Sequence, residues 1–590
     1  MAAGNNKNKL DWYVLGRVLR QATPYRRLFI TAAVLGVVLA PVAILRPHLI
    51  KVMVDDYIFH YDLDGMLRLT LLLFGVLILE AVLEYIFIYS TNLLGQSVIR
   101  DLRVRVFRHI SDLRLKYFDH TPIGTSTTRT INDIETINQV FTQGVINIVA
   151  DLLTLFAVLG IMLYTSWKLT LVCLTVLPLL IGATYIFKEK VKAAFQIVRS
   201  QISRMNAFLQ ERITGMRVVQ IFNAEEQEMS RFRSINKAYT QANLDSILYY
   251  AIFFPVVEII SAASLGLMVW YGARGVIGNE VTLGALVAFP IYLSMLFRPM
   301  RMLADKFNTL QMGLVASERV FTLLDREEFI PNTGDRQPAK LRGEVAFENV
   351  YFAYNARDWV LRDLSFRIEP GNTLAIVGST GSGKTTIINL LNRFYDIQKG
   401  RILVDGVDQR EYDLYALRNR LGMVLQDVFL FSGSVYENIT LRDEAIGREA
   451  VEKAARLIGA DAFIERLPGG YEYQVMERGA TLSMGQRQLI SFVRALVFDP
   501  DILILDEATS SVDPETEAVI QHAIEKLIAR RTSIIIAHRL STIRHADHVL
   551  VLSKGQVAEY GTHEELLQLE DGHYRHLHDM QFLQLADDEA

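Results

Sequence analysis

The sequence predicts a polytopic α-helical membrane domain with six transmembrane helices, followed by a soluble α/β domain. The first observation is size and composition: 590 residues, 51% of them hydrophobic, are too many for one domain and too apolar for an ordinary soluble enzyme. The second is the uneven distribution of charge. Residues 141–187 contain two charged side chains, Asp151 and Lys168, whereas residues 345–580 alternate charged and apolar segments as soluble domains do.

Composition also excludes several classes of protein. With 21% charged residues and bulky hydrophobic side chains throughout, the chain is not intrinsically disordered. A net charge of -4 gives no overall attraction for nucleic acid, so we expect no nucleic-acid partner. The single cysteine, Cys173, excludes an intrachain disulfide and a cysteine-rich metal site. The polar stretch Met1–Lys9 is not followed by a short apolar run with a cleavage site, so we expect no removable signal peptide.

Six apolar segments in the first half are long enough to cross a membrane. A bilayer core about 30 Å thick needs roughly 20 apolar residues of helix. The segments that meet this requirement are residues 28–53, 67–94, 142–165, 167–187, 248–272 and 281–305. This count predicts the six transmembrane helices.

The cations between these segments predict the topology, because Lys and Arg stay on the cytoplasmic side. Residues 54–66 contain four aspartates and no Lys or Arg, so this loop is expected outside. Residues 100–130 and 188–247 are rich in cations and are expected inside; their positions beside the membrane disfavour the alternative of nucleic-acid patches. These inside loops are long and helical in pattern, with expected tips near Pro122–Thr128 and Gln210–Gln220.

We therefore expect four regions along the chain. A membrane domain at residues 1–324 has long cytoplasmic loops, and residues 325–344 form a linker whose Pro331, Gly334 and Pro338 are typical of irregular structure. The soluble domain then spans residues 345–580. Residues 581–590 form a C-terminal tail.

The soluble domain contains a phosphate-binding loop. The apolar strand Thr373–Val377 leads into the sequence GSTGSGKT at residues 378–385, and a helical pattern follows at Thr386–Asn392. Glycines allow backbone N–H groups to point into one concavity, and the helix N-terminus adds partial positive charge. Lys384 reaches the outer phosphates and the Thr385 hydroxyl binds Mg2+. A glycine-rich turn with an incidental lysine is the weaker alternative, and the pattern predicts an α/β P-loop nucleotide-binding domain.

A second strand is expected to deliver acidic groups to the same site. The continuous apolar run Ile502–Leu505 is typical of a buried parallel strand, and Asp506 and Glu507 follow at its C-terminal end. Asp506 is the expected Mg2+ partner. Glu507 is expected to act as the general base that polarises the attacking water. Surface acids are the alternative, which the preceding apolar run disfavours.

Further motifs follow in a fixed order: Gln426 after the strand Gly422–Leu425, LSMGQ at residues 482–486, SSVD at residues 510–513, and His538 after the strand Ser533–Ala537. Together with the phosphate loop, this set resembles the ATP-binding-cassette ATPases. Six membrane helices ahead of one cassette resemble an exporter half-transporter, similar to bacterial multidrug exporters. The resemblance covers nearly the whole chain.

The resemblance implies roles for individual residues. Tyr354 matches the aromatic residue that stacks on adenine, although a tyrosine in a strand can also belong to the core. Gln426 matches the glutamine that contacts Mg2+ and water, and His538 matches the histidine that contacts the γ-phosphate. The implied catalytic residues are Glu507, His538 and Gln426. The implied Mg2+ ligands are Thr385, Gln426 and Asp506. The implied ATP-binding residues are Tyr354, Gly378, Ser379, Gly381, Ser382, Gly383, Lys384, Thr385, Thr386, Ser483, Gly485 and Gln486.

The segment at residues 482–486 matches the signature motif, which in this family binds the γ-phosphate of ATP held by the opposite cassette. The resemblance therefore implies a second half-transporter as partner. At the third signature position, Met484 replaces the usual glycine, which puts in doubt whether the site completed by this signature is fully active. Exporters of this kind include heterodimers with one impaired site, so a heterodimer is slightly favoured over a homodimer.

Four carboxylates fall within the apolar segments: Glu80, Glu84, Asp151 and Glu258. A charge at the bilayer centre costs roughly 2.5 to 3.5 kcal/mol on insertion scales, so such residues face a cavity or a partner. They are candidates for contact with the substrate. Pairing between helices, for instance with Arg46 or Arg298, is an equally weighted alternative.

These features predict ATP-driven export of small amphiphilic substrates across the bacterial cytoplasmic membrane by alternating access. A lipid or lipid-linked flippase is the alternative within the same mechanism, with membrane lipid as a partner in either case. An ATP-gated channel or regulator belongs to a different class and would conduct down a gradient. The six apolar segments disfavour a soluble ATPase, and the fused arrangement disfavours an importer.

Overall fold

The computed structural model describes residues 11–579 with the exception of 59, 356–357, 507–513, 530 and 538–542. It divides into two compact units. The first, which we call the helical unit, comprises residues 1–111 and 122–326. The second, which we call the α/β unit, comprises residues 112–121 together with 327–590. Glu507, His538 and the SSVD motif lie outside the described residues.

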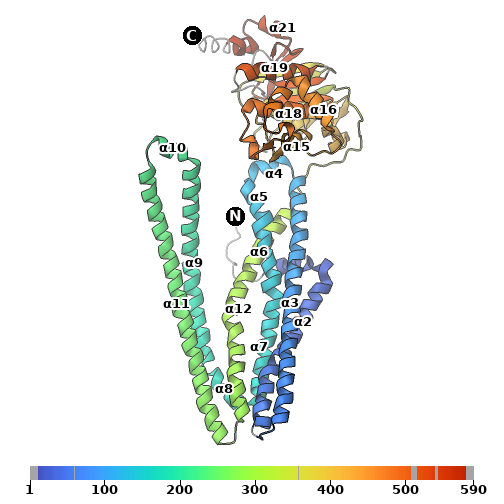
Figure 1. Cartoon of the computed structure of the whole chain (residues 1–590). Helices are drawn as coiled ribbons and strands as arrows, with labels where there is room; N and C mark the ends of the chain where they lie inside the picture. Colours follow the sequence, from blue (N-terminus) through green and yellow to red (C-terminus); the bar gives the residue numbers. More distant parts are fainter. Residues whose placement is uncertain are drawn as a thin grey trace. The chain divides into compact units, whose positions relative to one another are not determined.

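The helical unit combines several long helices with short ones (Figure 1). They are α1 (Trp12–Arg20), α2 (Arg26–Val52), α3 (Leu63–Asp112), α5 (Ile123–Thr128), α6 (Ile134–Gln139), α7 (Val145–Thr165), α8 (Trp167–Leu174), α9 (Leu177–Thr214), α10 (Met216–Ile221), α11 (Glu225–Ile277) and α12 (Leu283–Leu324). Among the described residues, 5 helical stretches are long and apolar enough to cross a membrane. A sixth, shorter apolar stretch, Leu283–Pro299, begins α12. The predicted polytopic helical membrane domain is confirmed.

Local sequence explains where these helices begin and turn. Ser166 separates α7 from α8, and its hydroxyl accepts the backbone N–H of Leu169 at 3.4 Å as the N-cap of α8. This one-residue connection agrees with the single residue that separates the predicted apolar segments 142–165 and 167–187. Helices α9 and α11 run side by side for 38 and 53 residues, well beyond a membrane crossing, and α10 lies at their far end (Figure 1). The tip expected near Gln210–Gln220 is thus found there.

The other predicted tip was misplaced by several residues. Pro122–Thr128 belongs to the helical unit, where Pro122 precedes α5 as its N-cap. The segment that joins the α/β unit is Asp112–Thr121, which contains α4 (Leu115–His120). The physical reason is that proline suits the start of a helix, because its missing N–H would have no helical partner there. The proline therefore marks the return of the chain into a helix.

In the part of the α/β unit that the structure describes, the strands form three sheets. Its strands are β1 (Val345–Phe352), β2 (Leu361–Ile368), β3 (Thr373–Gly378), β4 (Lys399–Val404), β5 (Val407–Asp408), β6 (Leu421–Val424), β7 (Gly433–Ser434), β8 (Gln474–Val475), β9 (Ile502–Asp506), β10 (Thr532–Ile536), β11 (His548–Ser553) and β12 (Gln556–Gly561). An antiparallel sheet has the order β2-β1-β4-β5, and a mostly parallel sheet has the order β12-β11-β3-β10-β9-β6. Strands β7 and β8 form a small pair.

The parallel sheet brings the predicted motifs to one edge. Strands β9 and β10 are buried along their whole length, as their continuous apolar sequences predict. Parallel pairing joins β11 to β3, β3 to β10, β10 to β9 and β9 to β6. The carboxyl ends of these strands therefore lie along a shared edge. The phosphate loop follows β3, Asp506 ends β9, and Gln426 follows β6 at this edge.

Helices of the α/β unit cover the sheets. They are α4, α13 (Lys384–Leu391), α14 (Leu414–Arg418), α15 (Val435–Thr440), α16 (Arg448–Ile458), α17 (Asp461–Arg466), α18 (Met484–Val497), α19 (Pro514–Ile528) and α21 (His563–Leu567). One core cluster packs α15, α16 and α18 against the parallel sheet, and a second fills the space between the two larger sheets and α13. The phosphate loop is anchored by β3 on one side and α13 on the other.

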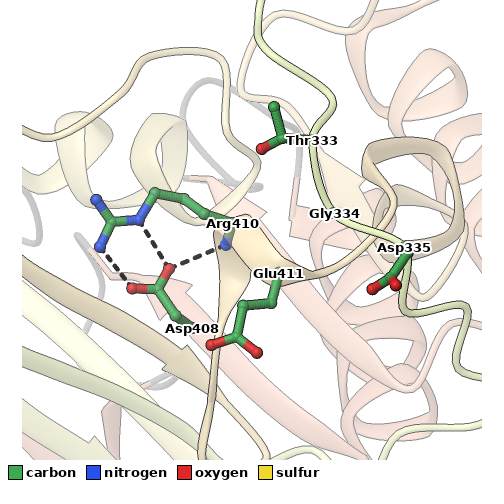
Figure 2. A pocket seen from close by; sticks show the side chains of 6 residues that line it. All are labelled: Thr333, Gly334, Asp335, Asp408, Arg410 and Glu411. Atoms are coloured by element: carbon green, nitrogen blue, oxygen red, sulfur yellow. Dashed lines mark hydrogen bonds and ion pairs between the residues drawn. The ribbon is translucent and has the colours of Figure 1, made fainter.

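The segment between α12 and β1 is fixed to the rest of the α/β unit by polar contacts. Arg393, 2% exposed, donates to the Pro331 carbonyl at 2.9 Å, and the Asn332 amide donates to Asp413 at 2.8 Å. Thr333, Gly334 and Asp335 then pass beside residues 408–411 around a shallow pocket (Figure 2). A Cβ on Gly334 would collide with the Tyr412 carbonyl, so this close approach requires glycine.

The same pocket holds a strong local ion pair. Asp408 accepts two bonds from the Arg410 guanidinium, at 2.6 and 2.9 Å, and one from its backbone N–H at 2.9 Å (Figure 2). Burial alone would raise the pKa of Asp408, but these bonds outweigh burial and lower it. The carboxylate is therefore charged and already satisfied, so it serves the structure of this turn.

Candidate nucleotide-binding site

The phosphate loop between β3 and α13 has the backbone of an anion cradle. Gly378, Gly381 and Gly383 have φ angles of 155°, 81° and 108°, which residues with a side chain rarely adopt. A Cβ on Gly378 would collide with the Leu552 carbonyl, and one on Gly383 would lie 2.7 Å from Leu361. The glycines let the chain curl tightly against β11 while its N–H groups precede the positive end of α13.

Two buried polar groups of the loop fit a phosphate. The Lys384 ammonium, in a side chain 8% exposed, donates to the carbonyls of Gly378 at 2.7 Å and Ser379 at 3.2 Å. Among the described residues, the buried hydroxyl oxygen of Ser382 has no hydrogen-bond partner. A buried hydroxyl without a partner is costly, and a phosphate oxygen in the cradle would satisfy it. The loop residues present thus fit a polyphosphate.

Gly378→Ala tests the cradle. We expect the affinity of the variant for ATP to fall by at least about 90%. The new methyl group forces β3 and the Leu552 carbonyl apart and widens the loop. Isothermal titration of the purified chain with ATP measures this effect. Gly371→Ala is the matched control: its φ is also positive, at 80°, but a Cβ there meets nothing within 4 Å. Equal affinities for the two variants would contradict the cradle.

The predicted metal ligands follow or end strands at the same edge of the parallel sheet as the phosphate loop, or begin the helix after the loop. Asp506 is 8% exposed at the end of β9, Thr385 is exposed at the start of α13, and Gln426 is exposed just after β6. One carboxylate with hydroxyl and amide oxygens fits Mg2+, which usually takes one or two carboxylates and completes its shell with phosphates and water. Glu507 follows Asp506 directly, but its side chain lies outside the described residues, as does that of His538.

Tyr354 is held beside the loop by its hydroxyl. It is half-buried, and its oxygen lies 3.2 Å from the Thr386 hydroxyl and 3.4 Å from the Asn389 amide. Thr386 is buried and already bonded to Tyr354, so it positions the aromatic ring as well as the loop. The Tyr354 ring also makes edge contacts with Phe352 and Tyr395. Sequence reasoning did not identify Tyr395.

The signature residues form the N-terminus of the 14-residue helix α18. Ser483 accepts the Gln486 N–H at 3.2 Å, and the Gln486 side chain accepts the Ser483 N–H at 2.9 Å. This capping box occupies both side chains but leaves the Ser483 hydroxyl hydrogen available for an outside acceptor. Gly485 is buried and Met484 is half-buried. The helix start is therefore rigid and electropositive.

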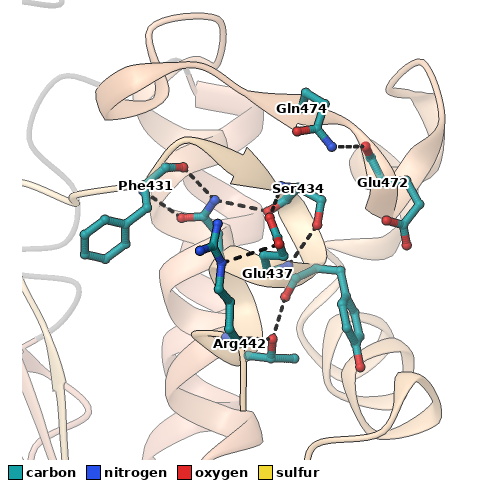
Figure 3. A network of polar contacts seen from close by, with 9 residues as sticks. Phe431, Ser434, Glu437, Arg442, Glu472 and Gln474 are labelled. Carbon is teal, nitrogen blue, oxygen red and sulfur yellow. Dashed lines mark hydrogen bonds and ion pairs between the residues drawn. The ribbon is translucent and has the colours of Figure 1, made fainter. Parts of the chain in front are cut away.

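The stretch after Gln426 presents a rigid apolar surface. Phe429 and Phe431 are 47% and 59% exposed. The Asn438 side chain accepts the Phe431 N–H and donates to the Phe431 carbonyl, both at 2.8 Å. Figure 3 shows Phe431 within this network of polar contacts. Ser434 and Glu437 form a second capping box at the start of α15. Exposed aromatic side chains on a fixed backbone are typical of a docking surface.

The four candidate carboxylates of the helical unit have different environments. Asp151 on α7 forms an ion pair with Lys306 on α12, so its partner is neither Arg46 nor Arg298. Glu80 is half-buried, and among the described residues its buried Oε2 has no hydrogen-bond partner. Glu84 and Glu258 are exposed. The sequence signal for Lys306 was available, since it directly follows the sixth apolar segment.

Comparisons with known proteins agree with this arrangement. A family model described as the ABC transporter transmembrane region matches residues 29–300, and one described as ABC transporter matches residues 361–510. A Bacillus subtilis relative named "Probable multidrug resistance ABC transporter ATP-binding/permease protein YheH" is 38% identical over 530 residues, which are 88% of this chain and 77% of the relative. An "ATP-dependent lipid A-core flippase" of Desulfotalea psychrophila is 34% identical over 96% of this chain and 99% of its own length.

A solved structure is similar over nearly the whole chain. It is a bacterial Atm1-family ABC exporter with ATP bound, which superimposes with a TM-score of 0.76 at 30% sequence identity. The match covers 94% of this chain and 98% of that structure. Both halves of the chain are therefore matched together, in the same order.

Proposed function

The chain belongs to the ABC transporter family, and from that membership we propose that it exports small amphiphilic molecules across the bacterial cytoplasmic membrane by alternating access. It is a multi-pass membrane protein whose cytoplasmic ABC transporter domain binds ATP and couples hydrolysis to transport. The observation that supports export most strongly is the phosphate cradle at residues 378–385 on the same chain as the apolar membrane helices.

In the proposed mechanism, the chain's own residues hold and activate the reactants. The loop N–H groups and Lys384 bind the phosphates, and Tyr354 stacks on the adenine. Glu507 accepts a proton from the attacking water, while His538 and Gln426 orient the γ-phosphate and that water. Thr385, Asp506 and Gln426 would hold Mg2+, which when bound neutralises charge on the phosphates.

A second half-transporter completes the proposed unit. The rigid N-terminus of α18, with Ser483, Gly485 and Gln486, is suited to bind the γ-phosphate of ATP on the opposite chain. The α10 tip exposes apolar side chains, with Ile221 74% and Phe222 76% exposed, as expected for a segment that packs against another surface. Met484 in place of glycine slightly favours a heterodimer over a homodimer.

The cargo proposed for this exporter is cationic and amphiphilic. The half-buried Glu80 and the exposed Glu84 and Glu258 place negative charge among membrane helices, where a cation with an apolar body is attracted. Asp151 is assigned a structural role instead, because Lys306 neutralises it. Of the four predicted substrate residues, Glu80, Glu84 and Glu258 therefore keep this proposed role.

Amide substitution at these three sites tests the cargo. The triple variant Glu80→Gln, Glu84→Gln, Glu258→Gln removes charge at nearly constant shape, so transport of ethidium should fall about tenfold while basal ATP turnover persists. Dye uptake into sealed vesicles and phosphate release measure the two effects. Asp151→Asn should instead lower thermal stability, because it leaves Lys306 unpaired, and exchanging Asp151 and Lys306 should recover it. Unchanged dye transport in the triple variant would contradict the cationic preference.

A lipid or lipid-linked flippase is the second candidate. It is favoured by the similarity to a protein named as a lipid A-core flippase over 96% of this chain. Flipping uses the same ATP-driven cycle, with membrane lipid as the substrate. Fluorescent-lipid translocation, unaffected by the three carboxylate substitutions, would favour the flippase over export of cationic molecules.

A further inference from the structure

Helix α4 and the residue before it are held by two adjacent residues of the α/β unit, Tyr395 and Asp396. The Tyr395 hydroxyl donates a hydrogen bond to the Asp119 carboxylate. The Arg114 guanidinium lies 3.6 Å from the Asp396 carboxylate. The segment therefore contacts the α/β unit through a cation, Arg114, and an anion, Asp119. Because each meets a complementary neighbour, the two contacts fix the position of the segment.

Main-chain and apolar contacts strengthen this attachment. Arg114 donates its backbone N–H to the Glu328 carbonyl at 3.0 Å and its Nε to the Phe329 carbonyl at 2.5 Å. Leu113 and Tyr117 are buried, at 6% and 2% exposure. The segment is thus attached through buried side chains as well as charges.

Tyr395 also touches the predicted adenine-binding residue. Its ring lies perpendicular to that of Tyr354, with centroids 5.0 Å apart, and Tyr395 is 8% exposed. The Tyr354 hydroxyl in turn contacts Thr386 at 3.2 Å, on the first turn of the helix that follows the phosphate loop. A continuous series of contacts therefore runs from Asp119 through Tyr395 and Tyr354 to Thr386.

Each contact in this series restricts the next. A hydroxyl bonded to a carboxylate is among the stronger hydrogen bonds, and it fixes the Tyr395 ring. Burial and the bond to Asp119 raise the pKa of Tyr395, so its hydroxyl stays protonated and remains a donor. Perpendicular aromatic pairs prefer a defined geometry, so rotation of Tyr354 disturbs Tyr395. A base stacked on Tyr354 would hold both rings in place.

We propose that Tyr395 is a positioning residue that links nucleotide binding at Tyr354 to the attachment of α4 through Asp119. The proposal rests on the adenine-binding role given to Tyr354 under the proposed function. Since linkage is reciprocal, ATP must strengthen the attachment of α4 by the same factor by which the attached α4 strengthens ATP binding. The link starts at the base end of the nucleotide, where Tyr354 is expected to stack on the adenine.

Hydrogen exchange on the full chain in lipid nanodiscs tests this link. The probe is ATP with excess EDTA, so that no turnover occurs. In the parent, ATP should slow amide exchange in residues 112–121 by about tenfold, the scale of one charge-assisted hydrogen bond. Tyr395→Phe keeps the ring and removes the donor, so ATP should slow exchange less than about twofold.

Three further variants separate the link from general damage to the fold. Tyr412→Phe removes another buried hydroxyl, which donates to the Val404 carbonyl at 3.0 Å, and should keep the full ATP effect. Asp119 is exposed, so Asp119→Ala should fold normally and lose the slowing of amide exchange by ATP. In the double variant Asp119→Ala, Tyr395→Phe, the loss of this ATP effect should be no larger than in either single variant, because both substitutions remove the same bond. An undiminished ATP effect in Tyr395→Phe, or none in an ATP-bound parent, would overturn the link.

The adenine-binding role of Tyr354 is tested separately by Tyr354→Ala. If this variant binds ATP as tightly as the parent does, the role of Tyr354 is wrong, and the linkage proposed through it is wrong as well. If ATP binding weakens but Tyr395→Phe leaves the exchange effect intact, only the link through Tyr395 fails.

Discussion

Glu507→Gln should depress ATP turnover by about 100- to 10,000-fold while ATP binding persists, the usual scale for loss of a general base. The carboxylate is expected to accept the proton of the attacking water, and an amide cannot. The residue before it in the sequence, Asp506, ends the buried strand β9 at the edge that also holds the phosphate loop. Phosphate release at saturating ATP measures the effect.

The control is Glu444→Gln, which makes the same chemical change at an exposed site between α15 and α16. It should turn over ATP as the parent does. The Glu507→Gln chain should also accumulate an ATP-bound state, visible as retained nucleotide after gel filtration. Parental turnover in Glu507→Gln would show that another group is the base.

Lys384→Ala should act at an earlier step and weaken ATP binding by about 10- to 100-fold, the scale of a hydrogen bond to a charged group. The ammonium is nearly buried and lies against the Gly378 and Ser379 carbonyls, at the centre of the cradle. Its loss removes the cation of the loop and leaves the backbone N–H groups and the Ser382 hydroxyl to bind the phosphates. Calorimetric titration with ATP measures the affinity.

The matched control for this variant is Lys453→Ala, on the exposed face of α16. ATP affinity there should be unchanged, since the side chain lies away from the loop. A Lys384→Ala chain that binds ATP normally but hydrolyses it slowly would instead place the lysine in the chemical step.

Local sequence patterns were sufficient for the main elements of both units. Strands β3, β9 and β10 were predicted within one residue at each end, because continuous apolar runs followed by glycine, acid or histidine leave few alternatives. The phosphate loop was predicted for a related reason, since its glycines occupy conformations that other residues avoid. The membrane helices were predicted from the length of apolar segments alone.

Contacts between distant parts of the chain were not predictable in this way. Asp151 and Lys306 are 155 positions apart, and Asp119 and Tyr395 are 276 apart. Which charges meet across such distances depends on how helices and sheets pack, and a pattern with a short period contains no information about it.

ATP-driven accumulation of a cationic dye tests the central claim most directly. The purified chain, with its partner subunit if one is required, is placed in sealed vesicles with the ATP-binding domain outside. We expect ethidium to accumulate inside above its external concentration when ATP is supplied, and to equilibrate only when Glu507→Gln replaces the parent. Equilibration without accumulation by the parent, during active ATP hydrolysis, would contradict an exporter and indicate a gated channel.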